Sequence, residues 1–306
     1  MAADLSPVAP AAAAPPPARH RQARQIVVGA VLVLLAWRGC LAWFPWRADF
    51  GEDNYQQNLL RIETFHRQIH RGETPAAVLA GTSVAGRLLP AYFADTPLAG
   101  LVNLGLDGAA PAFALELLLR ETQVPRTVFL ETFLLHKDPE TNETLILDSL
   151  DSPSGRLAAA DRLFHTETRP TALLYSALKR GRDAAATGRP APIQAPYRTI
   201  DPSPDALKRI THAIKQLQAR GSTVVLVDIP VGKDWPPGPN LGEPTASLLV
   251  NSLKLPRLDC RATLQAQGIE PRFTDGVHLD AASAREVARH LARIGMPGIA
   301  NPKSGP

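Results

Sequence analysis

Hydrophobic and polar positions divide the 306-residue chain into regions of different character. Residues 1–25 are rich in alanine and proline and then in arginine. A segment of this composition cannot bury enough apolar surface to fold, so we expect a disordered cytoplasmic tail. Residues 26–46 are almost entirely apolar, and from residue 54 onward helical and strand periodicities alternate, which is typical of a folded domain.

The apolar stretch has the length of a membrane span, which takes roughly 20 residues. Trp37, Trp43 and Trp46 suit the membrane interface, and the arginines upstream favour a cytoplasmic amino terminus. Arg38 opposes insertion, because a mid-helix arginine costs about 2.5–3.5 kcal/mol on insertion scales and less where it reaches the interface. We therefore expect an uncleaved transmembrane anchor at 26–46.

Two alternatives to the anchor stay open. One is a cleaved signal peptide with Ile26–Ala36 as its apolar core, although Cys40–Ala42 is a poor cleavage site. The other is a buried core helix. Both the anchor and the signal peptide export the rest of the chain, so we expect a single-pass protein of the inner (cell) membrane whose domain is periplasmic or otherwise extracytoplasmic.

Residues 47–74 are predicted to link the anchor to the domain through an amphipathic helix at 54–71, which Gly72 ends. We expect this helix to serve for packing or as a spacer. Its apolar residues recur at helical spacing and are Leu59, Leu60, Ile62, Phe65 and Ile69.

Residues 75–306 combine short apolar runs with amphipathic helices. Such alternation predicts an α/β fold with a doubly wound, mostly parallel sheet, flavodoxin-like in type. The pattern fails in a polar stretch at 136–204, which we interpret as an insertion or lid. The predicted strands are 76–80, 101–106, 127–132 and 223–229, the last being an unbroken apolar run typical of a strand buried on both faces.

Charge and cysteine content narrow the choice of partners. The 33 basic and 29 acidic residues give a net charge of +4, and much of the excess lies near the start of the chain. No basic patch points to nucleic acid, so we expect no nucleic-acid partner. Cys40 and Cys260 suit neither a disulfide framework nor a metal cluster, and we expect no cofactor and no metal.

Ser83 directly follows the first predicted strand. In doubly wound sheets ligands bind beyond the carboxyl ends of the strands. A serine on a turn into a helix exposes its hydroxyl and places its own backbone N–H where an oxyanion would form, as a nucleophile requires. The alternative is that Ser83 only caps the helix.

Asp275 lies three residues before His278, just ahead of the last predicted helix. An aspartate at this spacing can hold an imidazole in the tautomer that accepts a proton. The alternative is a solvated aspartate beside a loop histidine. Only His136 and His278 lie near strand ends, and only His278 has an aspartate at a useful spacing.

A third motif is Asn103-Leu-Gly-Leu-Asp-Gly108, which follows the second strand. A glycine here can bring a backbone N–H close to a ligand. The alternative is a glycine needed only for a tight turn, and the glycine spacing is incomplete for a dinucleotide site.

These three motifs, in this order, resemble the SGNH (GDSL-like) hydrolase superfamily over roughly residues 75–294. The resemblance implies that Ser83 is the nucleophile, His278 the general base and Asp275 its orienting partner. It further implies that the oxyanion accepts hydrogen bonds from the backbone N–H groups of Ser83 and Gly108.

Two departures from the family pattern concern the site. Thr82 stands where the family usually has aspartate before the serine. The family's oxyanion-hole asparagine after the third strand is missing from residues 129–135, and we expect the Thr132 hydroxyl to substitute for it. Loss of one such donor costs about 10²–10³ in turnover. Glu131 is interpreted as a salt-bridged structural residue or a substrate contact, and Trp235 as a sugar-stacking or a packing residue.

From this resemblance we expect a membrane-anchored serine esterase or acyl hydrolase acting on acyl (acetyl) esters of envelope or extracellular glycans. One alternative is a polysaccharide O-acyltransferase that uses the same triad beside a membrane acyl-donor protein. Another is a non-catalytic SGNH-like scaffold of an envelope complex. A flavodoxin-like nucleotide binder is a weaker alternative, since a phosphate-binding loop is missing from the sequence.

Overall fold

The computed structural model describes residues 17–43, 54–138, 140–174, 178, 200–232 and 241–294. The chain divides into two compact units, Met1–Trp46 and Arg47–Pro306. In the first unit, helix α1 spans Pro17–Trp43. Its segment Gln22–Trp43 has a mean hydropathy of 2.1 and is long enough to cross a membrane. A transmembrane anchor and an amino-terminal signal sequence both satisfy this test of length and composition.

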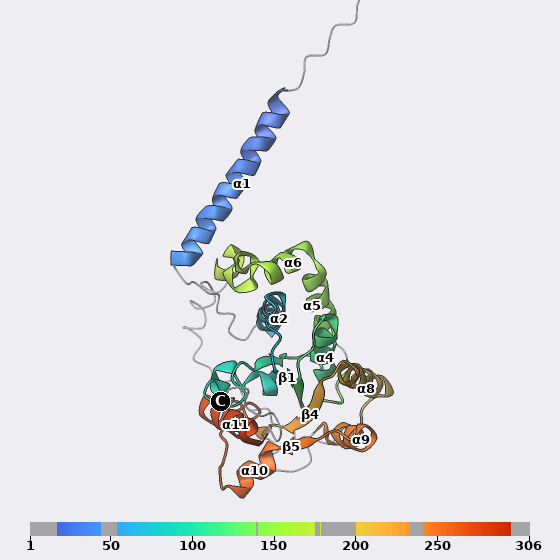
Figure 1. Ribbon diagram of the computed structural model, residues 1–306. Helices are drawn as coiled ribbons and strands as arrows, with labels where there is room; N and C mark the ends of the chain where they lie inside the picture. The colour runs from blue at the N-terminus through green and yellow to red at the C-terminus, as the bar shows by residue number, and fades with distance from the viewer. Residues whose placement is uncertain are drawn as a thin grey trace, which may run out of the picture. The chain divides into compact units, whose positions relative to one another are not determined.

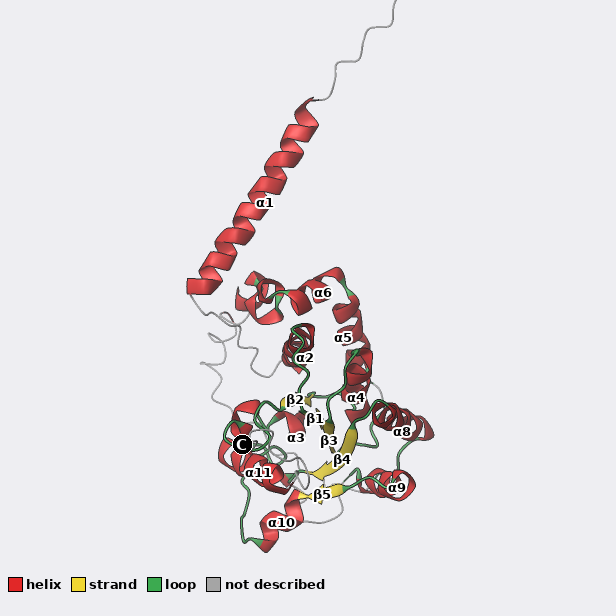
Figure 2. Cartoon of the chain, in the orientation of Figure 1, coloured by secondary structure: helices red, strands yellow, loops and turns green. Residues whose placement is uncertain are grey.

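The second unit is built on a five-stranded parallel sheet with the strand order β2-β1-β3-β4-β5. This order is that of flavodoxin-like doubly wound folds, and it confirms the predicted fold class. Figure 2 shows the strands between two groups of helices. The strands are β1 (Ala77–Gly81), β2 (Val102–Gly105), β3 (Thr127–Glu131), β4 (Thr223–Asp228) and β5 (Arg257–Asp259).

Helices cover both faces of the sheet (Figure 1). One face carries α2 (Asn54–His70), α4 (Pro111–Arg120), α5 (Thr141–Asp151), α8 (Pro204–Ala219) and α9 (Glu243–Leu253). The other carries α3 (Ser83–Gly86), the 3₁₀ turn η1 (Pro90–Phe93), α10 (Cys260–Ala266) and α11 (Ala281–Ile294).

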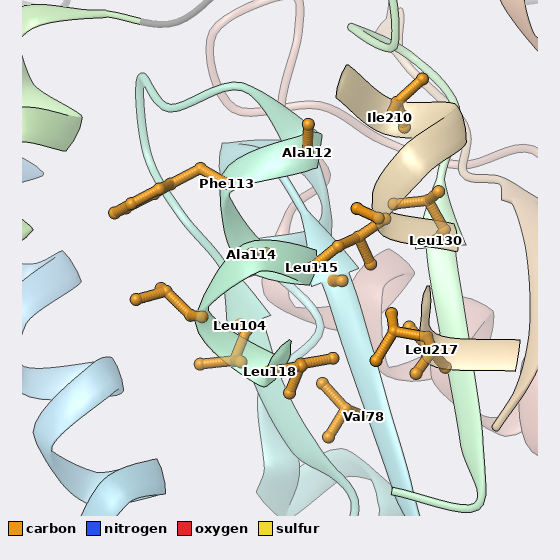
Figure 3. Close-up of a cluster of buried hydrophobic side chains, with 14 of the residues drawn as sticks. Val78, Leu104, Ala112, Phe113, Ala114, Leu115, Leu118, Leu130, Ile210 and Leu217 are labelled. Atoms are coloured by element: carbon orange, nitrogen blue, oxygen red, sulfur yellow. The ribbon is translucent and has the colours of Figure 1, made fainter. Parts of the chain in front are cut away.

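Side-chain alternation along each strand supplies both cores. In β1, Val78 and Ala80 belong to the core under α4 and α8, whereas Ala77 and Leu79 belong to the core under α11. Successive side chains of a strand point to opposite faces, so a strand buried on both faces must be apolar throughout. The same arrangement holds in β3 and β4. Figure 3 shows the first core, in which Val78, Leu118 and Leu217 lie among the labelled residues.

Helix α2 is an integral part of the sheet-containing unit. Leu59, Ile62 and Phe65 are buried in the first core, on the face that the helical spacing predicts. Burial of such side chains stabilises by roughly 1.5–3 kcal/mol each. The helix after the apolar stretch therefore packs as part of the sheet-containing unit.

The described part of the insertion packs against α2. It includes α5, α6 (Pro153–Ala160) and the 3₁₀ turns η2 (Arg162–Phe164) and η3 (Thr166–Thr168). The buried Glu63 of α2 accepts hydrogen bonds from the Thr166 N–H (2.8 Å) and hydroxyl (2.6 Å), which ties the insertion to this helix.

Candidate active site

Ser83 is the first residue of α3, two positions beyond the end of β1. Thr82 caps this four-residue helix, because its hydroxyl accepts the Val84 N–H. In the neighbouring strand β2, Gly105 lies opposite Gly81. A Cβ atom on Gly105 would meet backbone atoms of α3 at 2.2–2.7 Å, so only glycine allows this close approach. The turns after β1 and β2 consequently meet at one edge of the sheet.

The turn before α11 places Asp275 and His278 beside Ser83. The Thr274 N–H donates to the His278 carbonyl (2.8 Å), and Phe273 and Leu279 form an antiparallel bridge. Gly276 between them has φ +77°, a conformation that favours glycine. This small hairpin fixes the side chains of Asp275 and His278 in a defined relative position.

The three predicted side chains form a continuous hydrogen-bonded relay. His278 Nε2 lies 2.8 Å from Ser83 Oγ, and His278 Nδ1 lies 2.6 Å from Asp275 Oδ2. Ser83 and His278 are 195 positions apart in the chain. Such an arrangement can remove a proton from the serine hydroxyl, provided that the proton on the imidazole sits on Nδ1 and faces the carboxylate. His136, the other histidine near a strand end, makes no such contact with Ser83.

Asp275 is held in its charged form. Partial burial opposes ionisation, but hydrogen bonds from the backbone N–H and imidazole of His278 and from the Val277 N–H outweigh it and lower the pKa of Asp275. Its Oδ1 atom accepts the Val277 N–H at 3.0 Å and the His278 N–H at 2.8 Å. Oδ2 is thereby oriented toward the imidazole.

Two backbone N–H groups at this edge are available for an oxyanion. The amides of Ser83 and Gly108 donate to no other group among the residues that the structure describes. Gly108 has φ +78°, so this position needs the conformational freedom of glycine. Unpaired N–H groups beside a nucleophile are the donors that stabilise a tetrahedral intermediate in acyl transfer.

The Gly108 turn is held by α2. Asn58 Nδ2 donates to the Asp107 carbonyl, and Asn58 Oδ1 accepts the Asp107 N–H, both at 2.8 Å. Arg61 donates to the Gly105 carbonyl and to Asp107 Oδ1. Asn58 and Asp107 are both buried, so neither backbone group of Asp107 has ready access to water.

Two more side chains hold the same turn from other elements. Lys137, after β3, donates to the Gly108 carbonyl at 2.5 Å. Glu143 of α5 accepts the Ala110 N–H at 2.8 Å. The loop that carries the Gly108 amide is thus fixed by α2, the β3 loop and the insertion together.

Thr132 does not serve as the expected oxyanion donor. Its hydroxyl donates to Asp228 Oδ1, and Asp228 is paired with Arg257 through both carboxylate oxygens, at 2.6 and 3.0 Å. A hydroxyl has one proton to donate, and here the buried carboxylate takes it. The prediction that the Thr132 hydroxyl donates to the oxyanion is corrected on this ground. The backbone amides of Ser83 and Gly108 remain as candidate donors.

Glu131 supports the turn that carries Ser83 instead of forming a salt bridge. Its carboxylate accepts the Thr82 N–H (3.0 Å) and hydroxyl (2.9 Å) and the Phe133 N–H, and no ion pair to it occurs among the described residues. Burial raises the pKa of Glu131, although these hydrogen bonds oppose the rise. The salt-bridged interpretation was therefore wrong. The carboxylate touches the residue that precedes Ser83.

Two more residues shape the site. Asn103, which begins the third motif but was given no role of its own, donates to the carbonyls of Ala85 in α3 (2.8 Å) and of Leu88 (2.7 Å). Sequence reasoning missed Asn58, which lies four positions before Ile62. A polar residue on the apolar face of a predicted helix was the signal that could have pointed to it.

Trp235 lies outside the described residues. No metal-binding group occurs among the residues searched, which are those that the structure describes.

The Asn58 contacts lead to a prediction about turnover. Asn58→Ala leaves the buried Asp107 N–H and carbonyl unpaired, which costs about 1–3 kcal/mol per group, and loosens the Gly108 turn. We expect kcat for ester hydrolysis to fall by about 10–100-fold with little change in KM, since oxyanion stabilisation acts on the transition state. Thr64→Ala, an exposed position on the same helix, is the control. Unchanged kcat in a folded Asn58→Ala protein would show that α2 does not position the amide.

Comparisons with known proteins add a distant likeness among solved structures. No protein-family model and no curated protein matches the chain. Among solved structures, the chain is similar to the crystal structure of a candidate acylhydrolase from Bacteroides fragilis, with 14% sequence identity and a TM-score of 0.37. The match covers 76% of this chain and 95% of that one. A likeness of this size supports no inference about activity or substrate.

Proposed function

We propose that this chain is a membrane-anchored serine hydrolase of SGNH type that cleaves acyl esters through Ser83. The observation that carries the proposal is the Ser83–His278–Asp275 relay at 2.8 and 2.6 Å. It combines a nucleophile, a base and an orienting carboxylate in an accessible position. All three residues are partly exposed, so an ester can reach them.

The reaction begins with attack of Ser83 Oγ on the ester carbonyl carbon as its proton passes to His278 Nε2. The carbonyl oxygen becomes an oxyanion that accepts hydrogen bonds from the Ser83 and Gly108 amides. The C–O bond to the leaving alcohol breaks as His278 returns the proton to the alcohol oxygen, which gives an acyl-enzyme. Water, deprotonated by His278, then releases the carboxylic acid and restores Ser83.

The proposed substrates are acyl (acetyl) esters of envelope or extracellular glycans. Helix α1 supports this proposal, because its segment Gln22–Trp43 is long and apolar enough to cross a membrane, and basic residues before such a segment favour a cytoplasmic amino terminus. A sugar hydroxyl in place of water in the last step would make the protein an O-acyltransferase fed by a membrane acyl-donor protein. Product analysis with acetylated glycan and added acceptor sugar separates hydrolysis from transfer.

The test of the activated serine is covalent labelling with a fluorophosphonate probe. We expect the detergent-solubilised full-length chain to be labelled and Ser83→Ala to be unlabelled. Ser252→Ala, an exposed serine on α9, should label like the native chain. Absence of labelling in well-folded native protein would overturn the hydrolase proposal.

One observation favours a second candidate, a non-catalytic scaffold. The site lacks a side-chain oxyanion donor among the described residues after β3, because Thr132 is paired with Asp228 and Glu131 with Thr82. An enzyme with two backbone donors is slower than one with three by about 10²–10³, which leaves catalysis measurable. The intact relay therefore favours the hydrolase.

A further inference from the structure

A groove of about 520 Å³ lies between α11 and the segment that contains η1. One wall carries Arg285, Arg289 and Arg293, which recur every four residues along α11. Residues at this spacing lie on one helix face and are separated by roughly 6 Å along its axis. The opposite wall includes Tyr92 and Asp95.

Both walls belong to elements that follow relay residues closely in the sequence. Helix α11 begins at Ala281, three residues after His278, and η1 begins at Pro90, seven residues after Ser83. Both pack in the core under the same face of the sheet. Arg285 lies about one helical turn beyond the start of α11, and Arg289 and Arg293 lie one and two turns farther along this helix. None of the three relay residues lines the groove.

The arginines are suited to binding an external anion. The Arg285 guanidinium lies 5.1 Å from the centre of the Tyr92 ring, and no ion pair to Arg285 occurs among the described residues. Stacking on an aromatic ring holds the planar group in place while its N–H edges stay free to bind a carboxylate or phosphate.

The other two arginines share one weak partner. Glu286 lies 3.4 Å from Arg289 and 3.5 Å from Arg293, whose side chains are 57% and 59% exposed. Exposed pairs of this kind contribute roughly 0–1 kcal/mol, so an incoming anion can displace them.

We propose that this groove binds an anionic glycan chain, whose carboxylate or phosphate groups pair with Arg285, Arg289 and Arg293 while its acyl ester lies at Ser83. The inference rests on the proposed function and names the substrate class of that site. A row of three cations along one wall of a concave groove suits a charged chain lying lengthwise better than a flat lipid surface. The Asp95 carboxylate on the other wall disfavours an anionic surface that would contact both walls at once.

Binding of labelled polygalacturonate to the full-length protein in neutral detergent tests whether the groove binds a chain of carboxylates. Binding of polyphosphate tests whether it binds a chain of phosphates. The groove variant is Arg285→Gln with Arg289→Gln and Arg293→Gln. The control variant removes the same charge from exposed positions elsewhere, as Arg126→Gln with Lys208→Gln and Lys215→Gln. We expect at least tenfold weaker polyanion binding in the groove variant, less than twofold change in the control and no binding of neutral dextran. Added salt should weaken the native interaction.

Three results would overturn the proposal. These are equal losses in both triple variants, no binding of either polyanion by the native chain, or a groove variant that loses only binding to phosphatidylglycerol vesicles. The last result would assign the arginines to a membrane surface. Arg289→Glu, at a 57% exposed side chain, repeats the test with a single change in case the triple variant folds poorly.

Fluorophosphonate labelling separates this proposal from the proposed function. We expect the groove variant to be labelled at Ser83 like the native chain, with KM raised for an acetylated polyuronate and unchanged for a small acetyl ester. If the native chain binds polyanions but is not labelled, both the hydrolase proposal and the role of the groove in presenting an ester are contradicted. If the native chain is labelled but the groove variant binds polyanions as well as the native chain does, only the groove proposal is contradicted.

Discussion

Replacing His278 with alanine is expected to lower kcat for ester hydrolysis by about 10⁶-fold, the size of effect known for removal of the base from a serine triad. His278 Nε2 is the group within hydrogen-bond distance of Ser83 Oγ, at 2.8 Å. Without it, the serine hydroxyl keeps its proton and the leaving alkoxide has no proton donor. Residual turnover would come from the two backbone amides and from substrate binding.

The measurement is steady-state hydrolysis of a small aryl acetate, together with fluorophosphonate labelling. His212→Ala, at an exposed position on α8, provides a histidine control that should keep native kinetics. Loss of less than tenfold in a folded His278→Ala protein would mean that another group deprotonates Ser83, and would contradict the proposed relay.

Asp275→Asn is expected to lower kcat by about 10⁴-fold, because an amide in place of the carboxylate stabilises the wrong imidazole tautomer. Asp275 Oδ2 lies 2.6 Å from His278 Nδ1, which favours the tautomer with its proton on Nδ1. An amide N–H in that place would donate to Nδ1, so the imidazole proton would move to Nε2. A protonated Nε2 cannot accept the proton of Ser83.

Side-chain size hardly changes in this variant, and the backbone hydrogen bonds to Oδ1 can persist, so its thermal stability should stay close to native. Asp148→Asn, an exposed carboxylate on α5, is the matched control. A kcat for Asp275→Asn close to the native value would exclude an orienting role. In the native chain the lowered pKa of Asp275 keeps this carboxylate ionised into the acidic range.

The strands were predictable where local pattern and burial agree. The runs around β1, β2, β3 and β4 are apolar and bounded by turn residues, and the observed ends differ from the predicted ones by one residue or so. Strand β5 (Arg257–Asp259) was missed, because three residues with two charged side chains carry no strand pattern. It forms through parallel pairing with β4 and through the Arg257–Asp228 ion pair, both long-range effects.

Sequence alone determined the fold class, the apolar amino-terminal helix and the local chemistry of the Ser83 and Asp275–His278 motifs. These depend on periodicity and on spacings of a few residues, which short-range geometry converts directly into structure. Tertiary structure alone decided three other features. It brought Ser83 to His278, it committed Thr132 to Asp228, 96 positions away, and it placed Asn58 against the Gly108 turn. Contacts of this kind depend on strand order and helix packing, and a hydroxyl or amide finds its partner only when the neighbouring strands and helices have assembled.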